Sequence, residues 1–312
     1  MTHLRDYVGI DVGKHRLDVS FGAVSFSVSN DGAGHQQLVE RLSGGRVAAI
    51  GLEASGGYER AARTALRQAG LPVRLIDSWR LRQFAKGYGR YAKTDRLDAA
   101  MIARFTEVVP PEAEVERDPA CEELERLVSY REPLIAETVR LSNQIAQLDD
   151  DWLIAMSRRR LEVARDSLKE LNARIRAVVR GDKTLKRKAA ILESAPGIGF
   201  VNAITLLAKV PELGQRSPKK IAALVGLAPY DDKSGSRDKG AHIKRGRPLP
   251  RAKLCLAALS LLRNKPWAQA FRDKLTAKGK PKMVAVVALM RRLLVALNAM
   301  IKEDRFWREP AT

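Results

Sequence analysis

Short apolar runs alternate with helical patterns over the first third of the chain. Apolar runs of strand length cover residues 7–12, 17–21, 24–28, 47–52 and 73–76. Apolar residues at helical spacing cover residues 34–43, 57–69 and 94–107. Three early strands in succession, followed by strands that alternate with helices, predict a mixed sheet with helices packed on it. We therefore expect an α/β domain over residues 1–110.

The middle of the chain, residues 111–190, carries two helical patterns. After an acidic, proline-containing linker at 109–119, a heptad pattern with two polar interruptions runs through Leu124, Leu127, Arg131, Leu134, Thr138, Leu141, Ile145, Leu148 and Trp152. A second series, closed by Gly181, runs through Leu161, Ala164, Leu168, Leu171, Ile175 and Val178. The two series are out of phase, which predicts either a hairpin of two long helices or one helix with a stutter.

This middle segment has two interpretations. It is either a helical spacer that packs only on itself, or a coiled coil that pairs protomers into a dimer or tetramer. We favour the coiled coil, because a narrow apolar stripe would otherwise stay half exposed.

The last part, residues 191–312, is mainly helical with glycine and proline turns. Helical patterns cover residues 218–226, 249–263 and 281–302. Between two apolar helical runs, Pro196-Gly197-Ile198-Gly199 is typical of a helix–hairpin–helix turn. Its glycines would let backbone N–H groups approach a phosphate at a helix N-terminus. An ordinary turn between two helices has the same appearance.

Positive charge is concentrated in the last part of the chain. The protein carries a formal net charge of +20, divided as +5 for residues 1–110, 0 for 111–190 and +15 for 191–312. Such a domain is expected to bind a polyanion. Nucleic acid fits better than a membrane surface, because the basic residues lie mostly in loops and not on an amphipathic helix. The expected nucleic-acid contacts are Lys14, Lys93, Arg96, Gly197, Gly199, Lys233, Arg237, Lys239, Lys244, Arg245, Arg247 and Arg251.

Two other features of the sequence bear on the cellular compartment of the protein. No run of 18 uninterrupted apolar residues occurs, and the N-terminal residues have no apolar core of signal-peptide length. Cys121 and Cys255 are far apart in the sequence. Neither is part of a CxxC motif or of a cysteine–histidine cluster. We expect reduced thiols in a cytosolic protein that does not span a membrane.

Four carboxylates in three separated segments form the first candidate site. Asp11 and Glu53 each end an apolar run, and Asp95 and Asp98 share one face of a predicted helix. Convergence of these acids would suit Mg²⁺, with Mn²⁺ as the substitute, because hard cations take oxygen ligands. Taken separately, Asp11 could belong to a sugar-kinase-like nucleotide site, and the Asp95/Asp98 pair could be solvated salt-bridge partners. Asp18 and Glu59 are weaker candidates and are left out.

The second candidate site is a Gly/Ser loop rich in Lys and Arg, between Gly226 and Leu254. A serine hydroxyl is a poor nucleophile unless a base, cations or a metal stabilise the developing alkoxide. Ser234, followed by Gly235, is the candidate, although the loop could equally be a flexible surface that grips phosphate. His242 is the only histidine nearby in the sequence, and no Ser-His-Asp arrangement is visible.

Taken in order, these segments resemble the DEDD/serine transposases of bacterial insertion sequences, the family that includes the Piv DNA invertase and the bridge-RNA-guided recombinases. The resemblance covers essentially the whole chain. The matching segments are residues 9–14, Glu53 with 54–58, 93–99, 196–199, 226–229, Ser234-Gly235 and Gly246-Arg247.

The resemblance implies a RuvC-like, ribonuclease-H-type domain in which Asp11, Glu53, Asp95 and Asp98 hold the metal. It also implies a coiled-coil insert and a C-terminal transposase domain, whose serine becomes linked to a DNA 5′-phosphate. Ser234 is favoured over Ser236 for this role because the family's serine precedes a glycine.

The implied partners are the DNA of the element ends and target, a structured guide RNA, and further copies of the chain, in the nucleoid region of a bacterial cytoplasm. Two other functions stay open from the sequence. One is a junction-resolvase-like nuclease that uses water, and the other is a non-catalytic nucleic-acid-binding relative.

Overall fold

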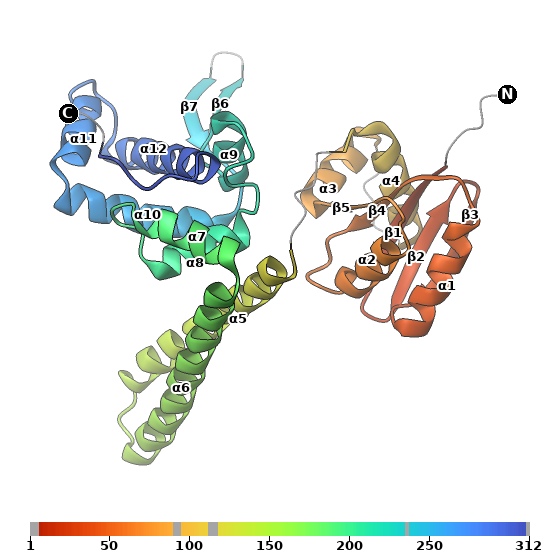
Figure 1. Cartoon of the computed structure of the whole chain (residues 1–312), viewed down its shortest axis with the longest axis horizontal. Helices are drawn as coiled ribbons and strands as arrows, with labels where there is room; N and C mark the ends of the chain where they lie inside the picture. The colour runs from red at the N-terminus through yellow and green to blue at the C-terminus, as the bar shows by residue number, and fades with distance from the viewer. Residues whose placement is uncertain (1–5, 90–94, 112–117, 235–236, 310–312) are drawn as a thin grey trace. The chain divides into compact units, whose positions relative to one another are not determined.

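The structure is a computed structural model that describes residues 6–89, 95–111, 118–234 and 237–309. Within helix and strand, the side chains of residues 95–98, 231–234 and 237–241 also lie outside the description. The chain divides into two units, residues 1–114 and 115–312, and each is described by itself (Figure 1).

The N-terminal unit is built on one mixed sheet. Its strands are β1 (Asp6–Val12), β2 (Arg16–Phe21), β3 (Val24–Ser29), β4 (Val47–Glu53) and β5 (Val73–Ile76). Their order in the sheet is β3-β2-β1-β4-β5. The first three strands pair antiparallel, and β4 and β5 continue from β1 in parallel. The predicted mixed sheet is therefore confirmed, strand by strand.

Helices cover both faces of this sheet. On one face, α1 (Gly32–Ser43) and α2 (Glu59–Gln68) bury Leu38, Leu42 and Leu66 against strand residues such as Ile10 and Leu52. On the other face, α3 (Ser78–Gly87) and α4 (Asp95–Val108) form a smaller apolar cluster with Ile76. The sequence did not predict α3. Leu81 is the only buried residue of this helix, so its sequence lacks a clear apolar face.

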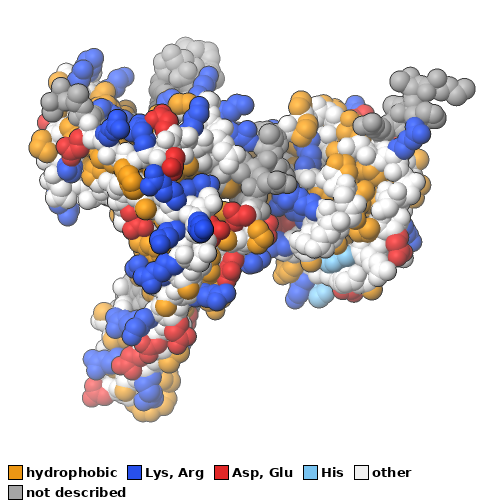
Figure 2. All heavy atoms as spheres, viewed as in Figure 1, with side chains coloured by type: hydrophobic (Ala, Val, Ile, Leu, Met, Phe, Trp, Pro, Cys, Tyr) orange, Lys and Arg blue, Asp and Glu red, His pale blue; other side chains and the backbone are white. Residues whose placement is uncertain are grey.

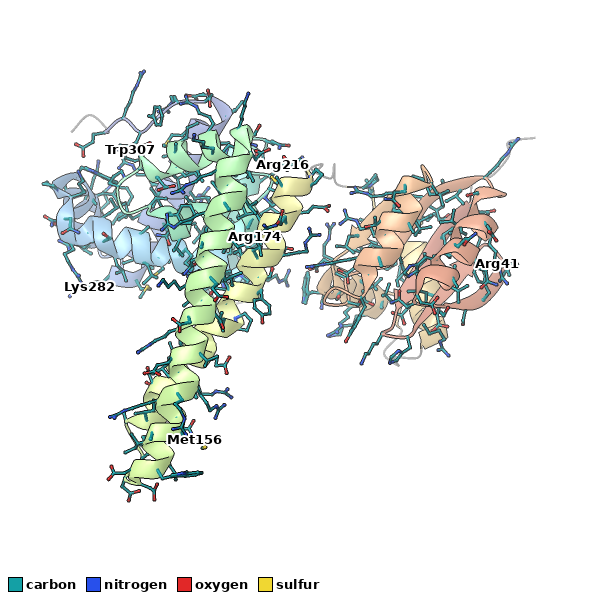
Figure 3. All side chains as sticks on the ribbon, turned by 60° about the horizontal axis from the view of Figure 1, so that its bottom comes forward. Arg41, Met156, Arg174, Arg216, Lys282 and Trp307 are labelled. Atoms are coloured by element: carbon teal, nitrogen blue, oxygen red, sulfur yellow. The ribbon has the colours of Figure 1, made fainter. Side chains whose placement is uncertain are left out.

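The C-terminal unit begins with a hairpin of two long helices, α5 (Pro119–Ile145) and α6 (Asp151–Gly181) (Figure 1). Figure 3 labels Met156 and Arg174 along α6. Leu141 of α5 packs against Leu161 and Ala164 of α6, so this part of the two apolar series is buried within the hairpin. Leu124 of α5 and Ile175 of α6 lie in the main apolar cluster of the unit.

Of the two predicted arrangements of this segment, the structure has the hairpin. The heptad pattern was expected to continue to Trp152, but α5 ends at Ile145. The reason is local, because the Asp150 carboxylate accepts a hydrogen bond from Leu153 N and starts a new helix. Trp152 is 67% exposed.

The rest of this unit is a helical core with one strand pair. Its helices are α7 (Lys183–Glu193), α8 (Phe200–Lys209), α9 (Pro218–Val225), α10 (Pro248–Asn264), α11 (Pro266–Thr276) and α12 (Lys282–Lys302). The three helices predicted from 218, 249 and 281 onward are confirmed. Strands β6 (Pro229–Ser234) and β7 (Arg237–Ile243) pair antiparallel where the sequence predicted only a loop.

Helix α12 is the central helix of this core. In the part of the chain that the structure describes, it is the one helix long and apolar enough to cross a membrane. Its residues Leu289, Leu293 and Leu297 are buried in the unit's main apolar cluster. The apolar character of α12 is accounted for by this packing.

Candidate active site

Asp11 and Glu53 lie side by side on neighbouring parallel strands. Ile10 of β1 is level with Leu52 of β4. The next residues along, Asp11 and Glu53, are therefore level as well and project from the same face. Both are partly exposed. Adjacent strands are about 4.8 Å apart, so these two carboxylates are close enough to share one cation.

Two glycines allow α4 to lie directly on this face of the sheet. A Cβ atom on Gly9 would be 2.0 Å from the carbonyl oxygen of Ala99, and one on Gly51 would be 2.1 Å from Thr106 Oγ1. Alternate residues of a strand share a face, so Asp11 and Glu53 project on the side that α4 covers.

The other two predicted metal ligands, Asp95 and Asp98, lie in the first turns of α4, before Ala99. Their side chains lie outside the described residues, so their part in the tetrad stays a prediction. Among the side chains that are described, no three acidic, histidine or cysteine residues form a group that could hold a metal. The structure thus brings together two of the four predicted carboxylates.

The donor set fits a hard divalent cation. Mg²⁺ is usually held by one or two carboxylates, with water and substrate phosphate oxygens completing its octahedron. Asp11 and Glu53 supply two carboxylates from a rigid sheet, at the carboxyl ends of parallel strands where α/β proteins commonly bind ligands.

A third carboxylate, Asp18, faces the same side of the sheet. Asp18 is the cross-strand partner of Asp11 and is 8% exposed. It accepts hydrogen bonds from Arg16 Nη2 at 2.8 Å and from Ser27 Oγ at 2.5 Å. Arg16 thereby offsets the negative charge beside Asp11. The sequence made Asp18 only a weaker candidate. Arg16 lies two residues away on the same strand, but Ser27 becomes its partner only through the pairing of β2 with β3.

Glu59 shapes the loop that follows Glu53. Its carboxylate accepts hydrogen bonds from Ser55 N, Ser55 Oγ and Gly57 N at 3.1, 3.0 and 2.8 Å. Burial by itself would raise the pKa of Glu59, but hydrogen bonds from its own N–H group and from Gly57 and Ser55 bring that pKa below its ordinary value. Glu59 is thus a loop-forming residue.

Asn30 connects the segments that follow Asp11 and Glu53. Its side-chain amide donates to the carbonyl oxygens of Gly13 at 2.9 Å and Tyr58 at 3.1 Å. The buried His35 ring contacts the amide oxygen of Asn30 at 2.8 Å, and burial lowers the pKa of His35. The turn after β1 and the loop after β4 are therefore held together. Lys14, a predicted nucleic-acid contact in that turn, is exposed.

Ser234 is the last residue of β6, at the tip of a two-stranded hairpin, which we call the serine hairpin (residues 229–243). Its register partner across the hairpin is Arg237. The side chains of Ser234, Lys233, Arg237 and Lys239 lie outside the described residues, as do Ser236, Lys93 and the side chain of Arg96. The predicted roles of these residues stay predictions.

The foot of the serine hairpin is the pair of segments at which the chain enters it (residues 226–228) and leaves it (residues 244–247). Close backbone packing joins these two segments. A Cβ atom on Gly246 would be 2.2 Å from Gly226 N, and one on Gly226 would be 2.1 Å from the Arg245 carbonyl oxygen. Both glycines have positive φ, as does Arg245 at 64°. Arg251, a predicted nucleic-acid contact, donates a hydrogen bond to the Arg245 carbonyl oxygen.

Arg247, also predicted to contact nucleic acid, makes hydrogen bonds through both terminal nitrogens of its guanidinium group to residues of the same C-terminal unit. It pairs with both oxygens of Glu212, at 2.5 and 2.7 Å. Lys244 and Arg245 beside it are exposed. In Figure 2, many Lys and Arg side chains lie over the helices of this unit, with acidic side chains among them.

The Pro196–Gly199 segment forms the turn between α7 and α8. Gly197 has a φ of 79° and approaches Ala257 closely, and Gly199 is the N-cap of α8. A cavity of about 570 Å³ beside the turn is lined by the turn, Lys265, Trp307 and Glu309 among others. Lys265 pairs with Glu309 at 2.7 Å. Phosphate binding by Gly197 and Gly199 stays a prediction.

Comparison with known sequences agrees with this arrangement. A transposase family of the DEDD, IS110 type matches residues 8–150. The transposase family IS116/IS110/IS902 matches residues 189–273. The first match contains the sheet with Asp11 and Glu53, and the second contains the glycine turn and the serine hairpin. The protein is therefore a DNA recombination enzyme of the transposase class.

Several relatives match over much of their length. The pilin gene-inverting proteins of Moraxella bovis and Moraxella lacunata are 27% and 26% identical to this chain, each over 96% of the chain and 97% of the relative. The transposase for insertion sequence element IS1111A of Coxiella burnetii is 25% identical over 73% of this chain and 70% of its own. The chain belongs to the IS110/IS116/IS902 family of insertion-sequence transposases.

Proposed function

We propose that this transposase cuts and rejoins DNA through a serine-linked 5′-phosphate, with Mg²⁺ or Mn²⁺ held by Asp11, Glu53, Asp95 and Asp98. The observation that carries the proposal is the placement of Asp11 and Glu53, which are level on adjacent strands and face α4. The mixed sheet, three antiparallel strands followed by two parallel ones, is the arrangement expected of a RuvC-like, ribonuclease-H-type domain.

The sheet supplies the electrostatic half of the chemistry. A bound divalent cation would act as a Lewis acid on the scissile phosphate and offset its negative charge. Asp11 and Glu53 hold their carboxylates in place because their strands are rigid and α4 packs directly on them. Arg16 keeps Asp18 committed to a different ion pair, so Asp18 does not compete for the cation.

The serine hairpin supplies the nucleophile. Ser234 Oγ attacks phosphorus, the Oγ–P bond forms, and the bond from phosphorus to the 3′ oxygen of the neighbouring nucleotide breaks. The serine proton is lost to solvent, and the departing 3′ oxygen takes up a proton. A 3′ hydroxyl of another strand then attacks the phosphoserine ester, which rejoins the DNA and releases the serine. The ester conserves the energy of the phosphodiester, so no external energy source is needed.

The basic C-terminal part is proposed to bind the nucleic acids of the reaction. Its net charge of +15 over residues 191–312 suits both DNA and a structured guide RNA, since both present phosphates. Sequencing RNA that co-purifies with the chain, expressed with its flanking noncoding DNA, tests the guide. We expect one structured transcript of the flanking DNA to be enriched. If the co-purified RNA has no common origin, the proposed guide RNA is wrong.

We further propose that the α5–α6 hairpin joins copies of the chain, within a three-part organisation of residues 1–110, 111–190 and 191–312. The buried members of the two apolar series pack within the unit, so pairing must use the outer surface of the hairpin. Exposed apolar residues on that surface support the proposal, with exposed fractions of 53% for Val139, 67% for Val163 and 67% for Trp152.

The experiment that tests the serine chemistry is the trapping of a denaturation-resistant protein–DNA adduct on labelled DNA of the element ends. The wild-type chain should form the adduct in the presence of Mg²⁺. Ser234→Ala should abolish it, and the matched variant Ser236→Ala should keep it. DNA affinity, measured by fluorescence anisotropy, should stay within about twofold for both variants, because binding is dominated by many phosphate contacts.

Each other outcome would indicate a different nucleophile or a different function for this protein. An adduct that survives Ser234→Ala but is lost in Ser236→Ala would move the nucleophile to Ser236. Cleavage without any adduct would indicate a nuclease that uses water. Binding without cleavage, in the presence of the guide and of Mg²⁺, would indicate a non-catalytic relative.

A further inference from the structure

Arg247 holds the foot of the serine hairpin to α8. Its Nη1 and Nη2 atoms pair with Glu212 Oε2 and Oε1 at 2.5 and 2.7 Å, and Nη1 also donates to the Lys209 carbonyl oxygen at 2.9 Å. Its backbone N–H donates to the Leu224 carbonyl oxygen at 3.1 Å. Lys209 is the last residue of α8, where unpaired carbonyl groups and the helix dipole favour a cation.

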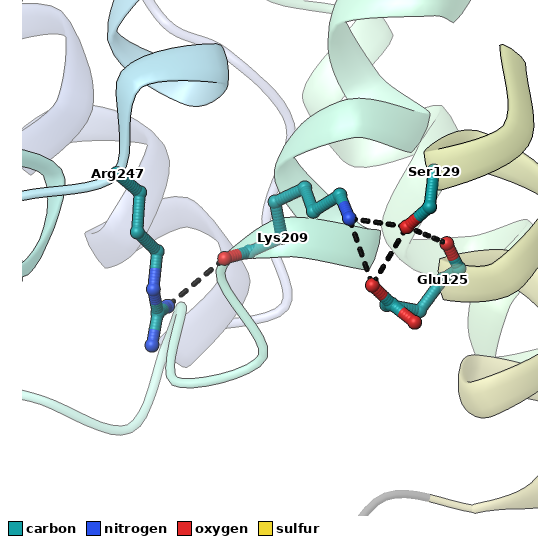
Figure 4. Close-up of polar contacts among 4 residues, drawn as sticks. All are labelled: Glu125, Ser129, Lys209 and Arg247. Carbon is teal, nitrogen blue, oxygen red and sulfur yellow. Dashed lines mark hydrogen bonds and ion pairs between the residues drawn. The ribbon is translucent and has the colours of Figure 1, made fainter. Parts of the chain in front are cut away.

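Lys209 extends this chain of contacts to α5 (Figure 4). Its ammonium group pairs with Glu125 Oε1 at 2.7 Å and contacts Ser129 Oγ at 2.5 Å. Ser129 Oγ in turn donates to Glu125 Oε1 at 2.8 Å. One residue, Lys209, thus contributes its carbonyl group to the hairpin's foot and its side chain to the first turns of the helical hairpin.

These contacts differ from ordinary surface ion pairs. The side chains of Lys209 and Glu125 are 24% and 18% exposed, and those of Arg247 and Glu212 are 32% and 15% exposed. Partial burial limits screening by salt, and the two-pronged Arg–carboxylate geometry fixes direction as well as distance. The contacts can therefore hold an orientation, which a mobile surface pair cannot.

The backbone at this point has little freedom of its own. Gly226 and Gly246 touch where the chain enters and leaves the hairpin, and Arg247 is the residue directly after Gly246. A shift of Arg247 would therefore be passed to the strand pair that carries Ser234 at its tip.

We propose that Arg247 and Lys209 are positioning residues for the serine chemistry, which orient the serine hairpin by tying its foot to α8 and α5. This inference rests on the proposed role of Ser234. It assigns Arg247 an internal task in place of the direct phosphate contact expected from the sequence, and it makes the packing of α5 on α8 a determinant of the hairpin's orientation.

The test compares four variants of the full chain. Arg247→Lys keeps the charge and loses the two-pronged geometry, and Lys209→Met removes the link to α5. Lys209→Glu combined with Glu125→Lys reverses that ion pair and should restore it. The control is Arg187→Lys, because Arg187 makes the same kinds of contact, with the carboxylate and carbonyl oxygen of Asp304, at an exposed site.

Two readouts are needed. Hydrogen exchange of the backbone amides in residues 226–247 should accelerate in Arg247→Lys and Lys209→Met, and return toward the wild-type rate in the reversed pair. The single-turnover rate of adduct formation should fall by about tenfold or more, since small misplacements of reacting groups are costly. DNA affinity and its salt dependence should be unchanged in all variants.

The outcomes separate the two proposals. If wild-type adduct formation is lost in Ser234→Ala but unaffected by Arg247→Lys and Lys209→Met, the positioning inference is wrong and the proposed function stands. If Arg247→Lys instead weakens DNA binding with unchanged exchange, Arg247 is a phosphate contact. If no adduct forms even in the wild type, the hydrogen-exchange measurement decides alone. Unchanged exchange in Arg247→Lys and Lys209→Met overturns the inference. Accelerated exchange, restored by the reversed ion pair, supports the orienting role of Arg247 and Lys209.

Discussion

The backbone of Ala99 in α4 rests directly on Gly9 of β1, with no room for a methyl group between them. This contact sets the height of α4 above the strand that carries Asp11. It also sets the position of the α4 turns that contain Asp95 and Asp98. The geometry of the proposed metal site therefore depends on a residue that has no functional group.

Replacing Gly9 should damage both stability and activity. Gly9→Ala is expected to lower the free energy of unfolding of the N-terminal unit by about 1–3 kcal/mol, because the added methyl group must push α4 away. Urea unfolding followed by circular dichroism measures this change. Gly32→Ala is the control, since nothing lies within 4 Å of a Cβ atom there. Equal stability of the two variants would contradict the packing described.

Removing either aligned carboxylate should stop the chemistry and spare binding. Asp11→Asn and Glu53→Gln are expected to lower DNA cleavage at least about 100-fold, because each removes a charged ligand of the cation. Chelation of divalent cations should have the same effect on the wild type, with recovery on addition of Mg²⁺.

The control for these variants is Asp77→Asn. Asp77 caps α3 by accepting a hydrogen bond from Arg80 N, and asparagine is an equally good cap. Cleavage by this variant should be normal. Full cleavage by Asp11→Asn would rule out the proposed metal site.

The loop that follows Glu53 should be sensitive to acid through Glu59. The pKa of Glu59 is lowered in the folded state, so its stabilising effect is fully present above the unfolded-state pKa and is lost as the pH falls through the folded-state pKa. Glu59→Gln should cost about 1–2 kcal/mol at pH 7. The difference from the wild type should shrink at pH values below about 4.5. A difference that is independent of pH, measured by urea unfolding at several pH values, would exclude this role.

The outer surface of the α5–α6 hairpin should control assembly. Val139→Glu combined with Val163→Glu is expected to shift the chain from dimer or tetramer to monomer, because a buried, unpaired charge is costly at an interface. Light scattering measures the mass, and circular dichroism checks that the helices are retained. Glu162→Lys is the control beside Val163. An oligomer that persists in the double variant would place the interface elsewhere.

The residue pattern predicted the five strands of the N-terminal sheet and several helices, and it supplied the candidate site residues. In β1, Val8, Ile10 and Val12 alternate with Gly9 and Asp11, so one face is apolar and the other carries the acid and the glycine. The positions of the carboxylates at strand ends, the two helical series and the basic C-terminal part could likewise be predicted, because each depends on neighbours in the sequence.

The pairing of elements could be decided only by the tertiary structure. The register of β1 on β4, which brings Asp11 level with Glu53, depends on residues about 40 positions apart, and a local periodicity carries no information about such partners. The same holds for the choice of a hairpin over a stutter and for the hydrogen bond from Ser27 of β3 to Asp18 of β2.

Arg247 shows the difference most clearly. Its charge and its place in a basic loop predicted a surface contact with nucleic acid, yet its guanidinium faces Glu212 and the end of α8. The sequence determined that a cation stands beside the serine hairpin. Only the folded chain decided what that cation pairs with, because a carboxylate 35 residues away is brought within hydrogen-bonding distance by helix packing.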